Sequence, residues 1–245
     1  MREAVYSTTE QLQRIAAIIK CCCRLPVSKD SVPGGFLETV FAHVRHARVL
    51  PNYDYVDVVD DSNRIGWSIK STKAGSPLTW KRAKPFNQTK LISDSQGSKE
   101  GLQQLGNALI DICNKHAKES MSKYHLAEIG YCRLIVHKSR QVTYFERKLC
   151  DLASSSLFNP DDFEWDWSVE KATKGKEQRS SLHGWHKTNG MRRWAWHGKG
   201  ENQLHFSAEQ KVWWPSDDQH KLEFTLPDSS SKLSFERLLE VLSAA

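Results

Sequence analysis

Residues 52–84 read NYDYVDVVDDSNRIGWSIKSTKAGSPLTWKRAK, and they predict a β-hairpin that leads into a basic segment. Residues 53–59 and 65–71 are rich in β-branched and aromatic side chains, which favour strands. The four residues 60–63 between them are Asp, Asp, Ser and Asn, which are typical of a turn. Such a hairpin brings side chains of residues 53–59 and 65–71 next to each other.

The register of this hairpin determines which side chains meet on one face. A turn centred near Asp61 places Asp54 opposite Ser68, with Lys70 two residues further along the second strand. An even-length loop instead places Asp57 on the face of Ser68. We prefer Asp54, because Asp57 lies nearer the turn. A carboxylate, a hydroxyl and an ammonium group then converge where a divalent cation and a phosphodiester would fit.

This hairpin resembles the active-site motif of the PD-(D/E)xK nucleases, among them many type II restriction endonucleases. In that family an acid on the first strand is followed by (D/E)-x-K on the second, where this chain has Ser68-Ile69-Lys70. The chain departs from the pattern at Ser68, and some restriction enzymes bring the missing carboxylate from elsewhere. The resemblance covers residues 36–117 and implies a restriction-endonuclease-like α/β core, with a small mixed sheet flanked by helices.

The resemblance also implies a function, a sequence-specific type II restriction endonuclease that cuts DNA with Mg²⁺. Asp54, Ser68, Lys70 and Glu38 would be the catalytic residues, and Asp54, Glu38 and Ile69 would hold the metal. Lys70 would orient the attacking water. Double-stranded DNA would be the partner, the protein would be a homodimer on a palindromic target, and the bacterial cytoplasm would be its location.

Two helices offer a carboxylate in place of the acid that Ser68 does not supply. Residues 36–46 form an amphipathic helix just before the hairpin, with Glu38 off its apolar stripe. Residues 98–118 form a second helix, with Glu100 in its first turn. The alternative for Glu38 is a solvated helix residue, and the alternative for Glu100 is an acid favoured by the helix dipole.

The segment after the hairpin is basic, since residues 72–90 contain five Lys or Arg and no acid. Such side chains neutralise phosphates, and Asn, Gln and Arg can read base edges, although a charged run is often a solvated loop. The predicted DNA contacts are Lys73, Thr79, Trp80, Lys81, Arg82, Lys84, Asn87 and Gln88, with Arg192 and Arg193 further on.

The composition changes beyond residue 158, which divides the chain into a nuclease core at 1–157 and a Trp-rich, β-rich recognition subdomain at 158–245. Trp194, Ala195 and Trp196 fit a strand with both aromatic rings on one face. Metal binding by the histidines of this part lacks a cysteine partner. The other predicted elements are a helix at 8–23, strands at 129–136 and 141–145, a short helix at 148–156 and a closing helix at 234–242.

Composition sets broad limits on the class of protein. The 245 residues carry 35 basic and 29 acidic side chains, a net charge of +6 that suits contact with phosphates. The six cysteines show no paired spacing, which indicates neither a disulfide framework nor a zinc knuckle and suits a reducing cytosol. No apolar run approaches the length of a membrane span.

Two other functions share this chemistry. Ser68 in place of the family's acid favours a DNA-binding protein that keeps the nuclease fold without cleaving. A repair or recombination nuclease would use the same site on a different DNA substrate.

Overall fold

The chain forms two compact units in the computed structural model. The structure describes residues 5–28, 31–51, 54–76, 78–154, 156–168, 171–173, 176–178, 180–198, 200–206 and 220–244. The first unit comprises Met1–Ala74, Ser120–Ala153 and Asp217–Ala245, and the second comprises Gly75–Glu119 and Ser154–Ser216. Both units are discontinuous in sequence, whereas the predicted division has a single boundary after residue 157.

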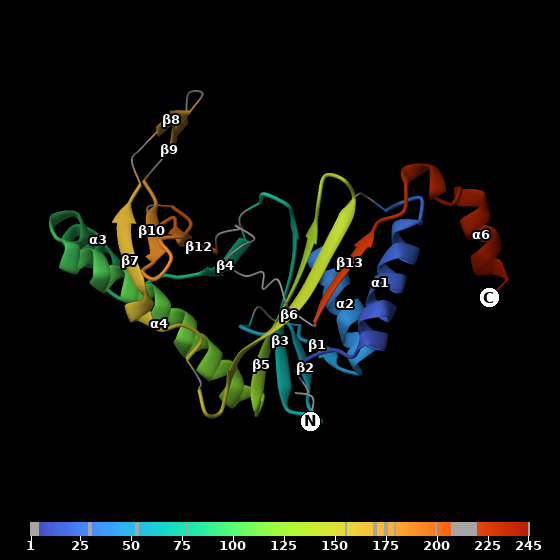
Figure 1. Cartoon of the computed structure of the whole chain (residues 1–245), viewed down its shortest axis with the longest axis horizontal. Helices are drawn as coiled ribbons and strands as arrows, with labels where there is room; N and C mark the ends of the chain where they lie inside the picture. The colour runs from blue at the N-terminus through green and yellow to red at the C-terminus, as the bar shows by residue number, and fades with distance from the viewer. Residues whose placement is uncertain are drawn as a thin grey trace. The chain divides into compact units, whose positions relative to one another are not determined.

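The first unit is built on a six-stranded sheet in the order β1-β2-β3-β5-β6-β13 (Figure 1). The pair β3 and β5 is parallel and the other neighbouring pairs are antiparallel, so the sheet is mixed. The strands are β1 (Arg48–Val49), β2 (Val58–Asp60), β3 (Ile65–Lys73), β5 (Glu128–Val136), β6 (Gln141–Asp151) and β13 (Lys221–Thr225).

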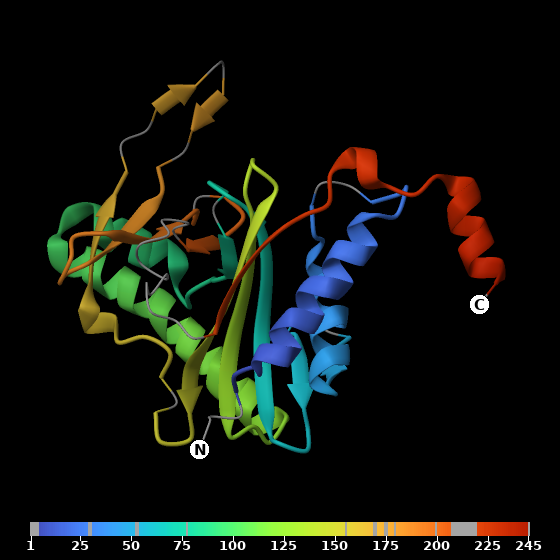
Figure 2. The ribbon, with the colours of Figure 1, turned by 45° about the vertical axis from the view of Figure 1, so that its right-hand side comes forward.

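Two helices, α1 (Thr9–Cys23) and α2 (Gly34–Arg45), lie side by side against one face of this sheet (Figure 2). The Thr8 hydroxyl accepts a hydrogen bond from the Gln11 N–H and the Gln11 side chain accepts one from the Thr8 N–H, a capping box that fixes where α1 begins. Trp67 is fully buried between the sheet and α2, and truncating it to Ala should cost on the order of 3–5 kcal/mol.

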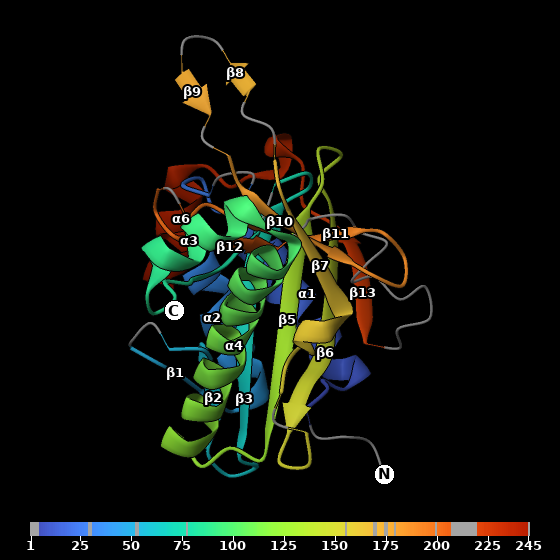
Figure 3. The same ribbon diagram turned by 90° about the vertical axis from the view of Figure 1, so that its left-hand side faces the viewer.

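The second unit is built on a five-stranded antiparallel sheet in the order β4-β12-β11-β10-β7. Its strands are β4 (Leu78–Arg82), β7 (Phe163–Trp167), β10 (Leu182–His186), β11 (Arg192–Trp196) and β12 (Gln203–Phe206). The short ribbon of β8 (Lys171–Thr173) and β9 (Lys176–Gln178) projects beyond β7 and β10 (Figure 3). The helices of this unit are α3 (Gln88–Gly97) and α4 (Lys99–Lys123), whose last residues belong to the first unit.

Trp165, Trp194 and Trp196 lie in the core of the second unit. Trp194 and Trp196 are fully buried on one face of β11, as their spacing predicts. Helix α4 approaches the same face so closely that a Cβ on Gly106 would lie 2.1 Å from Nε1 of Trp165. Only glycine permits this contact, which explains how the helix packs against large aromatic rings.

The structure confirms a mixed α/β class with a β-rich C-terminal part, and it corrects three predicted elements. The first strand of the hairpin, predicted at 53–59, is β2 at Val58–Asp60, so residues 54–57 precede the strand and Asp60 belongs to the strand rather than to the turn. The predicted helix at 148–156 is wrong, because β6 continues to Asp151 by pairing with β5. The predicted basic loop contains β4 and α3 instead. The closing helix α6 (Phe235–Ser243) is capped by the Ser234 hydroxyl. None of the described helices is both long and apolar enough to span a membrane.

Candidate active site

The turn of the first hairpin has four residues, 61–64, and it corrects the predicted register. Val58 pairs with Trp67, and Asp60 pairs with Ile65. The Asp60 carboxylate accepts hydrogen bonds from the Asn63 main chain at 3.0 Å and from the Asn63 amide at 2.7 Å. These bonds close an even-length loop, the alternative that places Asp57 rather than Asp54 on the face of Ser68.

This register places Asp57, rather than Asp54, beside the second strand of the motif. One carboxylate oxygen, Oδ2 of Asp57, accepts a hydrogen bond from the Ile69 main-chain N–H at 2.6 Å. It also accepts one from Nζ of Lys70 at 2.9 Å and a long contact from the Ser68 hydroxyl at 3.5 Å. The Asp57 and Lys70 side chains are 21% and 23% exposed, so the pair is accessible to a substrate yet held on several sides.

Asp54 has different partners. Its carboxylate accepts hydrogen bonds from Nζ of Lys123, at 2.7 Å, and from the Tyr124 hydroxyl. The bond from Lys123 to Asp54, followed by one with Tyr124, raises the pKa of the Lys123 ammonium. Asp54 therefore fastens the segment before β2 to the end of α4, and it is not brought to Ser68 as predicted.

Glu38 on α2 lies close enough to Asp57 and Lys70 to feel both charges. Burial raises the pKa of the Glu38 carboxyl, the negative charge of Asp57 raises it further, and the positive charge of Lys70 lowers it. Glu38 is therefore half-buried and near both charges, rather than fully solvated. The structure thus brings together the predicted residues Glu38, Ser68, Ile69 and Lys70 with Asp57, and we call these five residues the hairpin site.

Ser68 and Ile69 have supporting positions in the hairpin site. Ser68 is 4% exposed, so its hydroxyl faces the carboxylate of Asp57 and little else. The Ile69 side chain is buried in the core, and its main-chain N–H orients Asp57. Glu100, the other predicted source of a carboxylate, lies in the second unit, where it accepts a 3.5 Å bond from Gln104 on an exposed turn of α4.

The hairpin site offers two carboxylates to a metal ion. Among the described residues, no group of three or more His, Cys, Asp and Glu side chains lies at metal-ligand spacing. Oδ1 of Asp57 accepts no hydrogen bond from a described residue, in contrast to Oδ2. An octahedral Mg²⁺ commonly keeps several waters and takes only one or two protein carboxylates, so Glu38 and Asp57 suffice in number.

The predicted DNA contacts differ in their exposure. The exposed ones are Lys73, Thr79, Arg82, Lys84 and Asn87, and the half-buried ones are Lys81, Gln88, Arg192 and Arg193. Trp80 is a correction, because its ring is 8% exposed and packs in the core against Trp194 and Phe206.

Two of the half-buried residues predicted to contact DNA, Gln88 and Lys81, interact with other parts of the second unit. The Gln88 amide donates to the Gly198 carbonyl and to Oδ1 of Asn202, both at 2.8 Å. Lys81 lies near His116 of α4. Burial lowers the pKa of His116 most, and the positive charge of Lys81 lowers it further. The alternation of polar and apolar residues in β4 therefore arises because one face of the strand is buried and the other is exposed.

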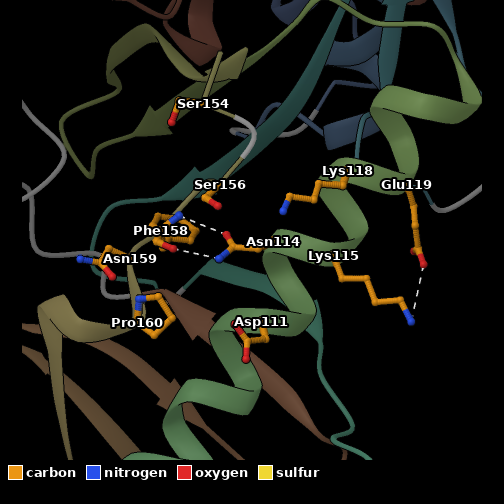
Figure 4. Close-up of a pocket in the computed structure, with 10 residues that line it drawn as sticks. All are labelled: Asp111, Asn114, Lys115, Lys118, Glu119, Ser154, Ser156, Phe158, Asn159 and Pro160. Carbon is orange, nitrogen blue, oxygen red and sulfur yellow. Dashed lines mark hydrogen bonds and ion pairs between the residues drawn. The ribbon is translucent and has the colours of Figure 1, made fainter. Parts of the chain in front are cut away.

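A pocket of about 700 Å³ lies in the second unit, beside α4 (Figure 4). The Asn114 side chain builds one wall by binding the main chain of Leu157 and Phe158. Lys115 is 3.8 Å from Glu119. The pocket contains no residue of the hairpin site, and its positive and negative side chains are balanced, which favours no ligand class. It is lined by Asp111, Asn114, Lys115, Lys118, Glu119, Ser154, Ser156, Phe158, Asn159 and Pro160.

Comparison of the chain with protein-family models, with curated proteins and with solved structures finds no match. The geometry and chemistry of the residues described above are therefore the basis on which a function is assigned.

Proposed function

We propose that the chain is a Mg²⁺-dependent DNA endonuclease of the type II restriction kind, which hydrolyses phosphodiester bonds in double-stranded DNA. The observation that supports this most is the convergence of the Asp57 carboxylate, the Glu38 carboxylate and the Lys70 ammonium beside one end of β2. Two acids and a lysine in this arrangement are what the resemblance to the PD-(D/E)xK nucleases requires, with Asp57 in the role expected of Asp54.

The two carboxylates fit a divalent cation. Burial first, and then repulsion from Asp57, raise the pKa of Glu38, and a bound cation would remove that repulsion. Oδ1 of Asp57 would be a ligand, while Oδ2 is held by the Ile69 N–H and by Lys70. When bound, Mg²⁺ supplies an acidified water and stabilises negative charge on the phosphate.

The remaining chemistry belongs to Lys70. Its side chain is 23% exposed and its Nζ lies 2.9 Å from Oδ2 of Asp57, so the carboxylate orients an ammonium group on a side chain that solvent still reaches. An ammonium in this place would orient the attacking water and offset charge on the phosphate as the bond to the leaving oxygen breaks. Ser68 and the Ile69 main chain would hold the Asp57 carboxylate rather than contact the DNA.

The test is digestion of phage and plasmid DNA with Mg²⁺, comparing the wild type with Lys70→Ala. Discrete bands are expected from the wild type, because a restriction enzyme cuts at defined sequences. They should disappear with a chelator, and Lys70→Ala should reduce the rate about 10²–10³-fold or more.

Lys123→Ala is the matched control, since Lys123 is also a lysine paired with an aspartate, at 2.7 Å from Asp54. It should keep its cleavage rate within a few-fold of the wild type. Equal loss in both variants would contradict a specific role for Lys70 and indicate a general loss of folding.

The second candidate is a DNA-binding protein that does not cleave, and the buried Ser68 at the position of the family's acid favours it. Absence of cleavage with either Mg²⁺ or Mn²⁺, with DNA still retarded in a gel, would support this candidate.

A homodimer belongs to the nuclease proposal if the target is palindromic, because the symmetry of the site would match that of the protein.

A further inference from the structure

Residues 5–7, which we call the N-terminal segment, lie in the core of the first unit. Val5 and Ser7 are 1% and 0% exposed, although they precede the first helix. The Ser7 N–H donates a hydrogen bond to Oε2 of Glu146 at 2.6 Å, and the Ser7 hydroxyl donates one to Oε1 at 2.6 Å. The ring of Tyr6 stacks on that of His220, with 3.8 Å between the ring centroids. The N-terminal segment is therefore fixed to β6 and to the residue before β13.

Glu146 is a buried acid that the hairpin site does not use. Its residue is 1% exposed, and Oε1 accepts a further hydrogen bond from the Tyr144 hydroxyl at 2.7 Å. Arg45, the last residue of α2, brings a positive charge to this place, since its Nη1 donates to the Ser7 hydroxyl at 3.2 Å. Buried charges are hydrogen-bonded and offset by an opposite charge. Ser7 thus links a carboxylate of the sheet to a guanidinium of α2.

Arg45 and the N-terminal segment both hold Trp67 of β3. Cζ of Arg45 lies 4.8 Å from the centroid of the Trp67 ring, and the Trp67 indole N–H donates to the Val5 carbonyl at 2.9 Å. Phe41, one turn before Arg45, meets the same ring edge-on, with 5.2 Å between the centroids. Trp67 directly precedes Ser68 of the hairpin site. The end of α2 is therefore fastened to β3 next to the hairpin site.

The start of α2 is fastened further along the same strand. The Ser71 hydroxyl donates a hydrogen bond to the Val32 carbonyl, just before the helix. The helix therefore runs antiparallel to β3, with its start beside Ser71 and its end beside Trp67. Glu38 lies on α2 between these two attachments, and Lys70 lies on β3 between them. The position of the Glu38 carboxylate in the hairpin site thus depends on where α2 is held along β3.

We propose that Arg45 and Ser7 are positioning residues for the metal site, because they fix α2 on β3 and so set the place of the Glu38 carboxylate beside Asp57. The proposal rests on the proposed function for its metal, but not on cleavage of DNA. Neither residue would touch the cation. Mg²⁺ requires near-ideal octahedral geometry, so a small displacement of one of two protein ligands weakens its binding. Residues that orient metal ligands typically change metal affinity about 10–100-fold.

A purely structural role for these buried charges is the alternative, and the two roles can be separated. Removing one charge of a buried pair leaves the other uncompensated and destabilises the fold, whereas replacing both charges by groups of similar size is often neutral. The double variant Arg45→Met/Glu146→Gln removes both charges and keeps the approximate size of both side chains. It also removes the guanidinium from Ser7 and Trp67. This variant therefore tests positioning with the smallest change in stability.

The test is calorimetric titration of the full chain with Mg²⁺ in the absence of DNA, together with the melting temperature of each protein. We expect Arg45→Met/Glu146→Gln to raise the Kd for Mg²⁺ about tenfold or more, and Arg45→Lys, which keeps a cation, to raise it less. Ile135→Val is the matched control, because Ile135 is buried on β5 but alternates with Leu134 and so faces away from α2. Its Kd should equal that of the wild type.

Two results would overturn the proposal and keep the metal site. These are a wild-type Kd in the folded double variant, and an equal rise of Kd in Ile135→Val at a similar melting temperature. Should the double variant fail to fold, Ser7→Ala removes only the linking hydroxyl, and a wild-type Kd there would also overturn the proposal. A wild type that binds neither Mg²⁺ nor Mn²⁺ would remove it together with the metal site. Weakened Mg²⁺ binding in the variants without cleavage of DNA by the wild type would keep this proposal and remove the nuclease.

Discussion

The hairpin site of the first unit and the outer face of the second sheet, which carries His183, His197 and His205, place their titratable side chains in different surroundings. In the hairpin site, Asp57 and Glu38 face Lys70, so two negative groups surround one positive group. On the outer face of the second sheet, burial is the largest cause that lowers the pKa of His183, His197 and His205, and for His183 Arg192 and His197 lower it further while Asp166 raises it. The first arrangement favours a bound cation, whereas the second disfavours the protonated form of its imidazoles.

Removing the second carboxylate should have the largest effect on this contrast. We expect Glu38→Gln to lower the cleavage rate about 10–100-fold, because a neutral amide relieves repulsion with Asp57 and binds Mg²⁺ more weakly. Cleavage measured against Mg²⁺ concentration should show a higher metal requirement. A Glu38→Gln protein with an unchanged rate and an unchanged metal requirement would restrict the hairpin site to Asp57 and Lys70.

The three histidines on the outer face of the second sheet should make the protein less stable as pH falls. Burial is the largest cause of the lowered pKa of His183, His197 and His205, so the unfolded chain binds more protons below about pH 6.5. Stability should therefore fall as pH falls through that value towards the folded pKa values. Thermal unfolding at a series of pH values should show a weaker slope in His183→Gln/His197→Gln, and equal slopes would contradict this.

The smallest effect is expected at Ser68. Its hydroxyl is 3.5 Å from Asp57, whereas the Ile69 N–H and Lys70 hold the same oxygen at 2.6 and 2.9 Å. Ser68→Ala should therefore keep cleavage within a few-fold of the wild type. A loss comparable to that of Lys70→Ala would show that the hydroxyl contacts the metal or the DNA directly.

The sequence predicts the elements of the hairpin site but not its register. Strand composition identifies the second strand, but it places the first strand at 53–59, whereas β2 is Val58–Asp60 and both Asp54 and Asp57 precede it. Glu38 follows from the helix just before the hairpin. Turn length, however, is set by the hydrogen bonds of Asn63 to Asp60, and a change of one residue there exchanges the faces of the strand. The choice between Asp54 and Asp57 therefore required the structure.

The second unit was harder to predict because its strands pair with partners that are far away in the sequence. Strand β4 lies in a polar, basic segment, and it forms by pairing with β12 more than a hundred residues later. Strand β6 extends through a segment with helical spacing for a similar reason, since its partner β5 continues alongside. The alternation of His183 and His205 with buried Leu182 and Leu204 was a signal in the sequence for the outer face.

The most direct test of the hairpin site compares Asp57→Asn with Asp54→Asn in Mg²⁺-dependent cleavage of the same DNA. The two aspartates lie three residues apart, and each binds a lysine. We predict that Asp57→Asn abolishes cleavage while its melting temperature stays near that of the wild type, and that Asp54→Asn continues to cut. Loss of cleavage in Asp54→Asn alone, with both proteins folded, would contradict the assignment of the hairpin site to Asp57.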